Sequence, residues 1–302
     1  MKDRIKILKK TEPGMCGGTD ATQNEDAPKT IKSENMILFD VTSAFGGMIE
    51  PDADEQFGYI SAFAAPSDGG TFMFIEKNDG FFGFNAARTY SFAHVKANPF
   101  PELAKLVKEF DLAKNNGFHS TTHGLPENFG GSVTIKYESG EKIDFSNNQS
   151  PIFSQKFAAA VSKLFKTFMD GEKVKLPDVS LLTKIYFEER RKNGGYTKAT
   201  LTINEDGTAT NEKQSKYDDP RVYESTKPVD AETVENIKRN IVNTGFLSWS
   251  GLPEMNYSFL NDKSITLYFK TGEEITVKGN KTAPDRISRG FFNIELEMTT
   301  KH

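Results

Sequence analysis

The sequence has one cysteine, Cys16, among its 302 residues. A single cysteine cannot form an internal disulfide, and this fits a reducing compartment such as the cytoplasm. The flanking residues offer an alternative, because a cysteine followed by the polar stretch "GGTDATQNEDAPKT" is typical of a lipid-anchored surface protein. The preceding residues, "KKTEPGM", are polar where such an anchor needs an apolar segment. We therefore expect a cytoplasmic protein, with a tether through Cys16 as the alternative.

Long apolar runs and dense basic runs are also missing. No stretch approaches the roughly 18 to 20 apolar residues that a membrane-spanning helix needs. The chain has 38 basic and 42 acidic residues and a net charge of -4, which argues against a protein that binds nucleic acid by neutralising phosphates. With 36% hydrophobic and 26% charged residues, the composition is typical of a soluble globular protein.

Recognisable catalytic and cofactor motifs are absent as well. There is no GxGxxG after an expected strand, no Walker loop, no GxSxG elbow and no HExxH sequence. Nor does the chain contain a cysteine cluster or a DxDxDG calcium loop. The sequence predicts no cofactor and favours a protein without enzymatic activity.

What the chain does contain is an internal similarity. The tetrapeptide GLPE occurs at Gly124 and again at Gly251, and each copy is followed by a similar stretch, "SVTIKYESGEKIDF" or "SITLYFKTGEEITV". Upstream, "NNGF" matches "NTGF", and "FIEKNDG" matches "LTINEDG". Collinear matches at nearly one spacing predict a tandem duplication with copies at 36–175 and 179–300, after an N-terminal lead of 1–35 whose first part is expected to be mobile.

Each copy is expected to run strands, helix, loop and β-hairpin. Apolar residues at helical spacing predict helices near 100–110, 155–168 and 231–243, and Asp230 is a candidate N-cap. Alternating apolar residues and the turns "ESGE" and "KTGE" predict the hairpins. The last segment of copy two, "DRISRGFFNIELEM", is more typical of a strand. The fold class predicted is α+β with mainly antiparallel sheet and two similar packed halves.

The first copy is rich in phenylalanine. It holds 19 of the 25 phenylalanines, and its "FMFI" strand is apolar on both faces, whereas the matched strand of copy two alternates and should have a wet face. Internal cover is one explanation; a patch that binds a ligand, a protein partner or a second copy of the chain is the other. The candidate patch residues are Phe72, Phe74, Phe81, Phe82 and Phe84.

Two further sets of residues are candidates for a site. His119 and His123 lie four residues apart before Glu127, so a helical turn would let both bind one zinc ion. The chain would then be a metal-assisted hydrolase centred on these three residues. A helix-stopping glycine before the histidines argues against that geometry. The glutamates of the two GLPE loops, Glu127 and Glu254, together with Trp249, would form a loop pair if they faced each other across a cleft. The preferred hypothesis is a binding or interaction protein that uses the phenylalanine-rich copy or a cleft between the copies.

Overall fold

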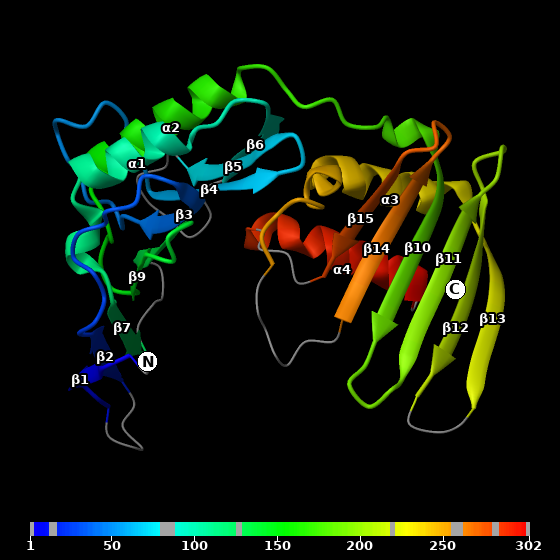
Figure 1. Cartoon of the computed structure of the whole chain (residues 1–302), viewed down its shortest axis with the longest axis horizontal. Helices are drawn as coiled ribbons and strands as arrows, with labels where there is room; N and C mark the ends of the chain where they lie inside the picture. Colours follow the sequence, from blue (N-terminus) through cyan, green and yellow to red (C-terminus); the bar gives the residue numbers. More distant parts are fainter. Residues whose placement is uncertain are drawn as a thin grey trace. The chain divides into compact units, whose positions relative to one another are not determined.

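The computed structural model describes residues 3–11, 17–78, 88–124, 129–217, 221–254, 262–279 and 284–299 (Figure 1). The chain forms two compact units, Met1–Lys173 and Val174–His302. Each unit is a β-sheet with helices against it, and nearly all neighbouring strands pair antiparallel. The expected α+β class is therefore confirmed at this level.

The sheet of unit 1 has nine strands among the described residues, in the order β1-β2-β7-β9-β8-β3-β4-β5-β6. Only β7 and β9 pair in parallel. The strands are β1 Ile5–Lys9, β2 Gly18–Asn24, β3 Met36–Ala44, β4 Tyr59–Ser67, β5 Gly70–Asn78, β6 Thr89–Val95, β7 Phe118–His123, β8 Gly130–Tyr137 and β9 Lys142–Asn147.

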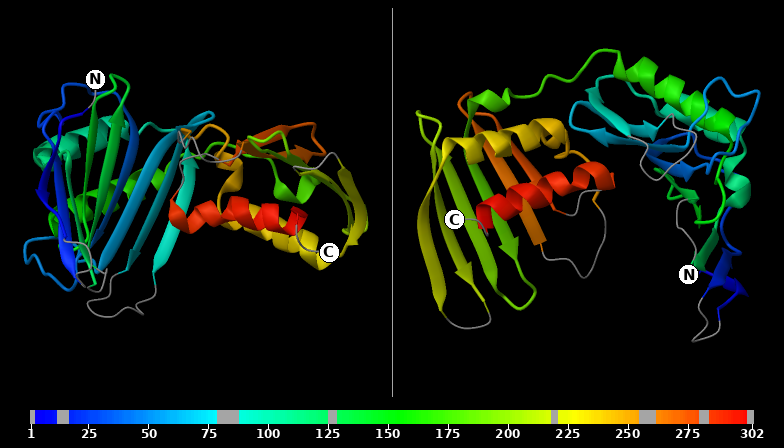
Figure 2. Two further views of the ribbon diagram at one scale, coloured as in Figure 1. Left: turned by 90° about the horizontal axis from the view of Figure 1, so that it is seen from below. Right: turned by 180° about the vertical axis from the view of Figure 1, so that it is seen from behind.

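Two α-helices cover one face of this sheet, α1 (Phe100–Glu109) and α2 (Gln155–Met169), and a 3-10 turn, η1 (Leu112–Asn115), follows α1 (Figure 2). The Ser154 hydroxyl accepts a hydrogen bond from the Phe157 amide and caps α2. The apolar stripes predicted for both helices face the sheet and join one core of buried side chains, among them Leu103, Val107, Phe157, Val161 and Phe165.

The sheet of unit 2 has six strands among the described residues, in the order β13-β12-β11-β10-β14-β15. Its helices are α3 (Ala231–Asn243) and α4 (Asp285–Thr299), with 3-10 turns η2 (Val179–Leu181) and η3 (Phe246–Ser248). As predicted, the Asp230 carboxylate caps α3 by accepting from the Thr233 amide. The strands are β10 Leu182–Arg190, β11 Tyr196–Ile203, β12 Ala209–Lys216, β13 Val222–Val229, β14 Asp262–Phe269 and β15 Glu274–Lys278.

The segment 285–299 forms α4 and not the strand predicted from its sequence. Phe291, Ile294 and Met298 are buried at helical spacing, so the helix hides these side chains on one face. A strand would have divided them between two faces of a sheet.

The N-terminal segment is part of unit 1 and not a separate lead. Residues 5–9, which we expected to be mobile, form β1 and pair with β2, which in turn pairs with β7. All five side chains of β1 are exposed. The strand therefore has no buried face that an alternation of apolar residues in the sequence would mark. Backbone hydrogen bonds hold it instead, and the Arg4 guanidinium lies 2.7 Å from the Asp26 carboxylate.

Apart from β7, the order of the described elements in unit 1 from β3 to α2 is the same as the order in unit 2 from β10 to α4. The strands β6-β5-β4-β3-β8-β9 correspond to β13-β12-β11-β10-β14-β15, with a helix and a 3-10 turn inserted at the same point and a helix at the end. A β-bulge interrupts β3–β8 pairing between Met36 and Leu38 and β10–β14 pairing between Leu182 and Lys184. Strands β1, β2 and β7 have no counterpart in the described part of unit 2.

This order differs from the sequence alignment of the two units after the first helix. The sequence comparison matched Gly117 with Gly245. In the structure, the left-handed residue that links α1 to η1 is Asp111 (φ 50°), and the one that links α3 to η3 is Gly245 (φ 63°). Asp111 thus occupies the position of Gly245, because aspartate tolerates this conformation better than most residues do.

Candidate ligand-binding pocket

The two candidate patch phenylalanines that the structure describes are buried in the interior. Phe72 and Phe74 have no exposed surface, whereas Phe81, Phe82 and Phe84 lie outside the described residues. Met73 joins the core under the helices, so by strand alternation Phe72 and Phe74 point to the opposite face of the sheet. Phe72 offers no exposed surface to a partner, and neither does Phe74.

Other aromatic rings surround them on that face. Phe72 contacts Phe63 and Phe92 at ring-centroid distances of 6.3 and 6.2 Å, and Phe74 stacks on Tyr90 at 6.1 Å. The matched residues of unit 2, 199–202, lie in β11, where Ala199 and Leu201 are buried and Thr202 is exposed. By sheet order β11 corresponds to β4 and not to β5, so the sequence comparison paired two strands that are not equivalent. The contrast between a two-sided apolar strand and an alternating one, expected from the sequence, is present in the structure.

The two candidate histidines lie in a strand and have separate partners. Nδ1 of His119 is 2.9 Å from the Ser146 hydroxyl, and Nε2 of His123 is 3.0 Å from the Asp20 carboxylate. Residues four apart in a strand are separated by roughly 13 Å, too far for two bonds of about 2.0 Å to one zinc ion. Glu127 lies outside the described residues. Within the described ranges, no group of three histidine, cysteine or acidic side chains is placed to hold a metal.

The GLPE loops serve packing where they are described. Leu252 is 1% exposed, and the Glu254 carboxylate makes an exposed ion pair of 2.9 Å with Lys278. Trp249 is buried beside Phe246, and its indole N–H donates to the Thr244 carbonyl at 3.2 Å. Gly124 adopts a positive φ of 78°, and Leu125 to Glu127 lie outside the described residues. Glu254 and Trp249 therefore have structural partners within unit 2.

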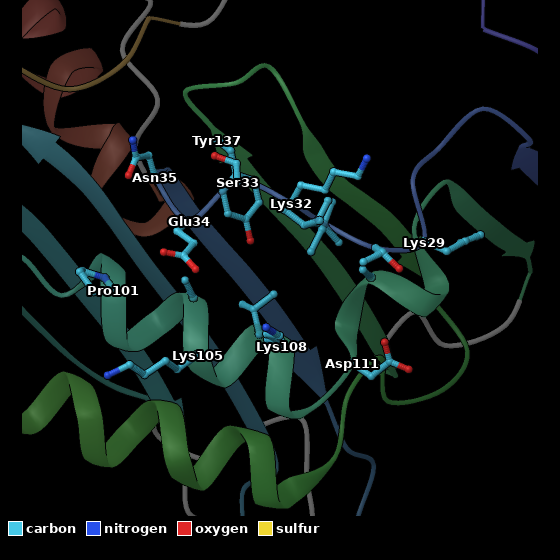
Figure 3. Close-up of a pocket in the computed structure, with 16 residues that line it drawn as sticks. Lys29, Lys32, Ser33, Glu34, Asn35, Pro101, Lys105, Lys108, Asp111 and Tyr137 are labelled. Carbon is cyan, nitrogen blue, oxygen red and sulfur yellow. The ribbon is translucent and has the colours of Figure 1, made fainter.

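A pocket of about 430 Å³ lies in unit 1, between the extended segment 29–35, helix α1 and the β8–β9 hairpin (Figure 3). This volume lies within the range of small-molecule sites. Its inner wall is mainly apolar, and charged side chains surround its mouth. The residues that line it include Ile31, Lys32, Glu34, Ala104, Lys105, Val107, Lys108, Tyr137 and Ile143.

Tyr137 supplies the polar group of the inner wall. Val133, Ile135 and Tyr137 alternate along β8 and face the helices, so the last of them reaches the pocket at the end of the strand. Only 3% of the residue is exposed, and no described residue makes a hydrogen bond with its hydroxyl. Figure 3 shows this hydroxyl pointing from the sheet toward α1. The hydroxyl is not one of the fully buried polar atoms without a partner, so it keeps contact with the pocket space, where a bound acceptor would meet it.

Burial raises the pKa of the Tyr137 phenol to about 12, and the nearby Glu141 carboxylate adds to the effect. Both disfavour the charged phenolate, the first through loss of solvation and the second through like-charge repulsion. The hydroxyl therefore keeps its proton across the physiological pH range. It is available to a ligand as a neutral hydrogen-bond donor.

The outer wall is held in place by two side chains from connecting segments, Glu141 in the β8–β9 turn and Asn116 between η1 and β7. The Glu141 carboxylate accepts hydrogen bonds from the amides of Lys32 and Ser33 at 3.1 and 2.9 Å. These bonds lower the pKa of Glu141, the first of them having the largest effect. Asn116, which is buried, donates to the carbonyls of Pro28 and Lys142 at 2.8 Å each. The segment 29–35 is thus fixed over the pocket although it forms no regular secondary structure.

Six charged side chains stand around the mouth, four lysines and two acids: Lys29, Lys32, Lys105, Lys108, Glu34 and Asp111. Two of the lysines are engaged, since Lys29 donates to the Asn116 carbonyl at 2.5 Å and Lys105 pairs with Glu102 at 2.7 Å. Lys108 is exposed and makes no side-chain hydrogen bond or ion pair with any residue that the structure describes. In Figure 3, Lys108 and Glu34 lie beside the space that the Tyr137 hydroxyl enters.

Sequence reasoning did not identify this pocket, because its walls come from three segments far apart in the chain. One signal was available. The matched hairpin stretches place Tyr137 opposite Phe269, so that a hydroxyl stands in one copy where the other has none. Because the matched position accepts phenylalanine, the fold does not require the hydroxyl group of Tyr137.

A scan of protein-family models and a search of curated proteins found no match to this chain. Of the helices in the described residues, none combines the length and apolarity needed to cross a membrane. Assignment of a function therefore rests on the geometry of the site.

Proposed function

We propose that the chain is a non-enzymatic binding protein whose unit 1 holds a small organic molecule in the pocket between segment 29–35, α1 and the β8–β9 hairpin. The observation that carries the proposal is the Tyr137 hydroxyl, which faces the pocket from a side chain that is otherwise packed in the core and has no hydrogen-bond partner among the described residues. A neutral donor that is held at the wall of a pocket and not used by the protein is available to a ligand.

We also propose that the two units arose by duplication. The shared strand order, the bulge at one position of both sheets and the inserted helix support this origin. So do the turns, since the amides of Tyr137 and Phe269 donate to the carbonyls of Glu141 and Glu273, each at 3.0 Å. An experimental structure with a different strand order in either unit would contradict it.

The duplication strengthens the binding proposal. Phe269 fills the position of Tyr137 in unit 2 and is 4% exposed, so the frame accepts a residue without a hydroxyl there. Copy two has Val242 at the place of Lys108, counted from the left-handed residues Gly245 and Asp111 that end the two helices. Hydroxyl and ammonium both belong to unit 1 alone, and a shared packing role accounts for neither.

The test is a titration of the ¹⁵N-labelled full-length protein with a library of small amphipathic compounds, followed by amide chemical shifts. We expect at least one compound to shift the amides of residues 29–35 and of α1, with weaker binding to Tyr137→Phe. Tyr217→Phe is the control, because it removes an exposed hydroxyl from unit 2. Compounds that shift only other regions, or that bind wild type and Tyr137→Phe equally, would contradict the proposal.

Two earlier alternatives stay separate from this pocket. The hydrolase hypothesis loses its geometric basis, since His119 and His123 point to different partners along β7. The tether through Cys16 concerns a residue outside the described ranges, and mass spectrometry of protein from its native host would detect a lipid there.

A further inference from the structure

We infer that the ligand of the unit 1 pocket is an organic monoanion, a carboxylate on an apolar body, held by Lys108 and Tyr137. The inference rests on the proposed function, because it names the chemical class of the molecule that the pocket takes. Three features of the pocket support it: the charge at its mouth, its hydrogen-bond donors and the apolar inner wall.

Lysines outnumber acids in the pocket lining, although Lys105 is paired with Glu102 outside it and the chain as a whole is negative. Four lysines and two acids line the pocket, while the whole chain has 38 basic and 42 acidic residues. A local excess of positive charge raises the concentration of anions at the opening and speeds their association. The same charge lowers the concentration of cationic ligands at the opening.

Lys108 at the mouth and Tyr137 on the inner wall are hydrogen-bond donors. The Lys108 ammonium offers three N–H groups and the Tyr137 phenol one O–H, and neither uses them on a described residue. An ionised carboxylate only accepts hydrogen bonds, so one carboxylate satisfies both. Because Tyr137 is neutral, Lys108 supplies the positive charge beside it in Figure 3, and Lys32 also makes no side-chain hydrogen bond or ion pair with a described residue.

The inner wall fits an apolar body. Ile31 and Ala104 are half-buried on opposite sides of the pocket, and Val107 and Ile143 are buried behind them. Burial of a ligand's hydrocarbon against such side chains is favourable in proportion to the area removed from water. The carboxylate then stays near the mouth, where water and Lys108 solvate it.

Glu34 gives the inference a sharp test. Its carboxylate lies at the mouth, is exposed, and has no side-chain partner among the described residues. It repels a bound anion and attracts a cation. Neutralising it therefore changes affinity in opposite directions for the two classes of ligand.

The experiment uses the full-length protein and three probes with the same eight-carbon chain, octanoate, 1-octanol and octylamine, with affinity measured by calorimetry at neutral pH. We expect octanoate to bind most tightly. Lys108→Gln should weaken octanoate about tenfold, Tyr137→Phe about threefold, and Glu34→Gln should tighten it about threefold. Lys114→Gln, the same charge change at an exposed site outside the pocket, should have little effect.

The outcomes separate the inference from the function on which it rests. Weaker octanoate binding in Glu34→Gln, or a preference for octylamine that Lys108→Gln does not reduce, would overturn the anion while leaving a ligand in the pocket. Binding of octanol as tight as that of octanoate would also overturn it. If no probe bound, and no compound of the amphipathic library shifted the amides of the pocket, the proposed binding function would be wrong. Circular dichroism of each variant confirms that it is folded.

Discussion

Tyr137 and Phe269 occupy the same position in the two units. Each is the last residue of the first hairpin strand, each lies beside a bulge, and each donates its amide to the carbonyl of the residue four positions later at 3.0 Å. They differ by one hydroxyl group. Substitutions at these two positions therefore measure how the hydroxyl group changes the free energy of unfolding at equivalent places in one molecule.

Exchange of the two residues should have unequal effects on stability. Tyr137→Phe should change the free energy of unfolding by less than about 1 kcal/mol, because the lost hydroxyl has no described partner. Phe269→Tyr should cost about 1 to 3 kcal/mol by burying a hydroxyl where the frame holds phenylalanine. Urea unfolding at neutral pH measures both. A loss above 2 kcal/mol in Tyr137→Phe would mean that the hydroxyl has a structural role.

The raised pKa of Tyr137 predicts how stability falls in alkali. The phenol has a pKa of about 12 in the fold against an ordinary value of 10.0, so the folded state holds its proton more tightly than the unfolded state. Its contribution to stability is complete below pH 10 and is lost as the pH rises through 12. Wild type should lose more stability than Tyr137→Phe above pH 10, measured by thermal unfolding over that range. Parallel curves for the two proteins would contradict this.

His94 should weaken the fold in mild acid. It is 6% exposed, and neither ring nitrogen has a hydrogen-bond partner in the described part of the chain. Burial lowers its pKa below the ordinary value of 6.5, against a smaller opposing effect of Asp68. The unfolded state therefore binds the proton more readily, and stability falls as the pH drops below about 6.5 toward the folded pKa.

Replacement of this histidine tests the assignment. His94→Leu removes the titrating group, so its stability relative to wild type should increase as the pH falls from 7.5 to 5. The comparison is made between the two proteins at each pH, because other groups titrate in both. A constant difference across the range would show that His94 is not the group that responds.

The second GLPE loop should depend on its leucine more than on its glutamate. Leu252→Ala should cost about 2 to 4 kcal/mol, since the side chain is 1% exposed and its loss leaves a cavity. Glu254→Ala should cost less than about 1 kcal/mol, because its ion pair with Lys278 is exposed to solvent. Chemical denaturation of both variants gives the comparison. A larger loss from Glu254→Ala would point to a role beyond this ion pair.

The histidines of β7 should not bind zinc together. We expect elemental analysis of the purified protein to find no stoichiometric zinc. The double variant with His119→Ala and His123→Ala should lose less than about 2 kcal/mol, for one partly buried hydrogen bond and one exposed pair. One metal ion per chain that disappears in the double variant would restore the hydrolase hypothesis.

Local patterns in the sequence determined most of the regular elements. The apolar stripe of Leu103 and Val107 and the cap at Asp230 placed α1 and α3, and the alternation of Val133, Ile135 and Tyr137 placed β8. These elements were predictable because each one buries a face whose period is written in neighbouring residues. The α+β class followed from them.

Tertiary structure decided what depends on distant residues. β1 has only exposed side chains and exists through its pairing with β2, so no local burial pattern marked it. In α4 the aromatic and β-branched content favoured a strand, although Phe291, Ile294 and Met298 gain burial only as a helix. The pocket is the clearest case. Ile31, Lys108 and Tyr137 come from three separate segments, and only the long-range packing of segment, helix and hairpin brings them to one cavity.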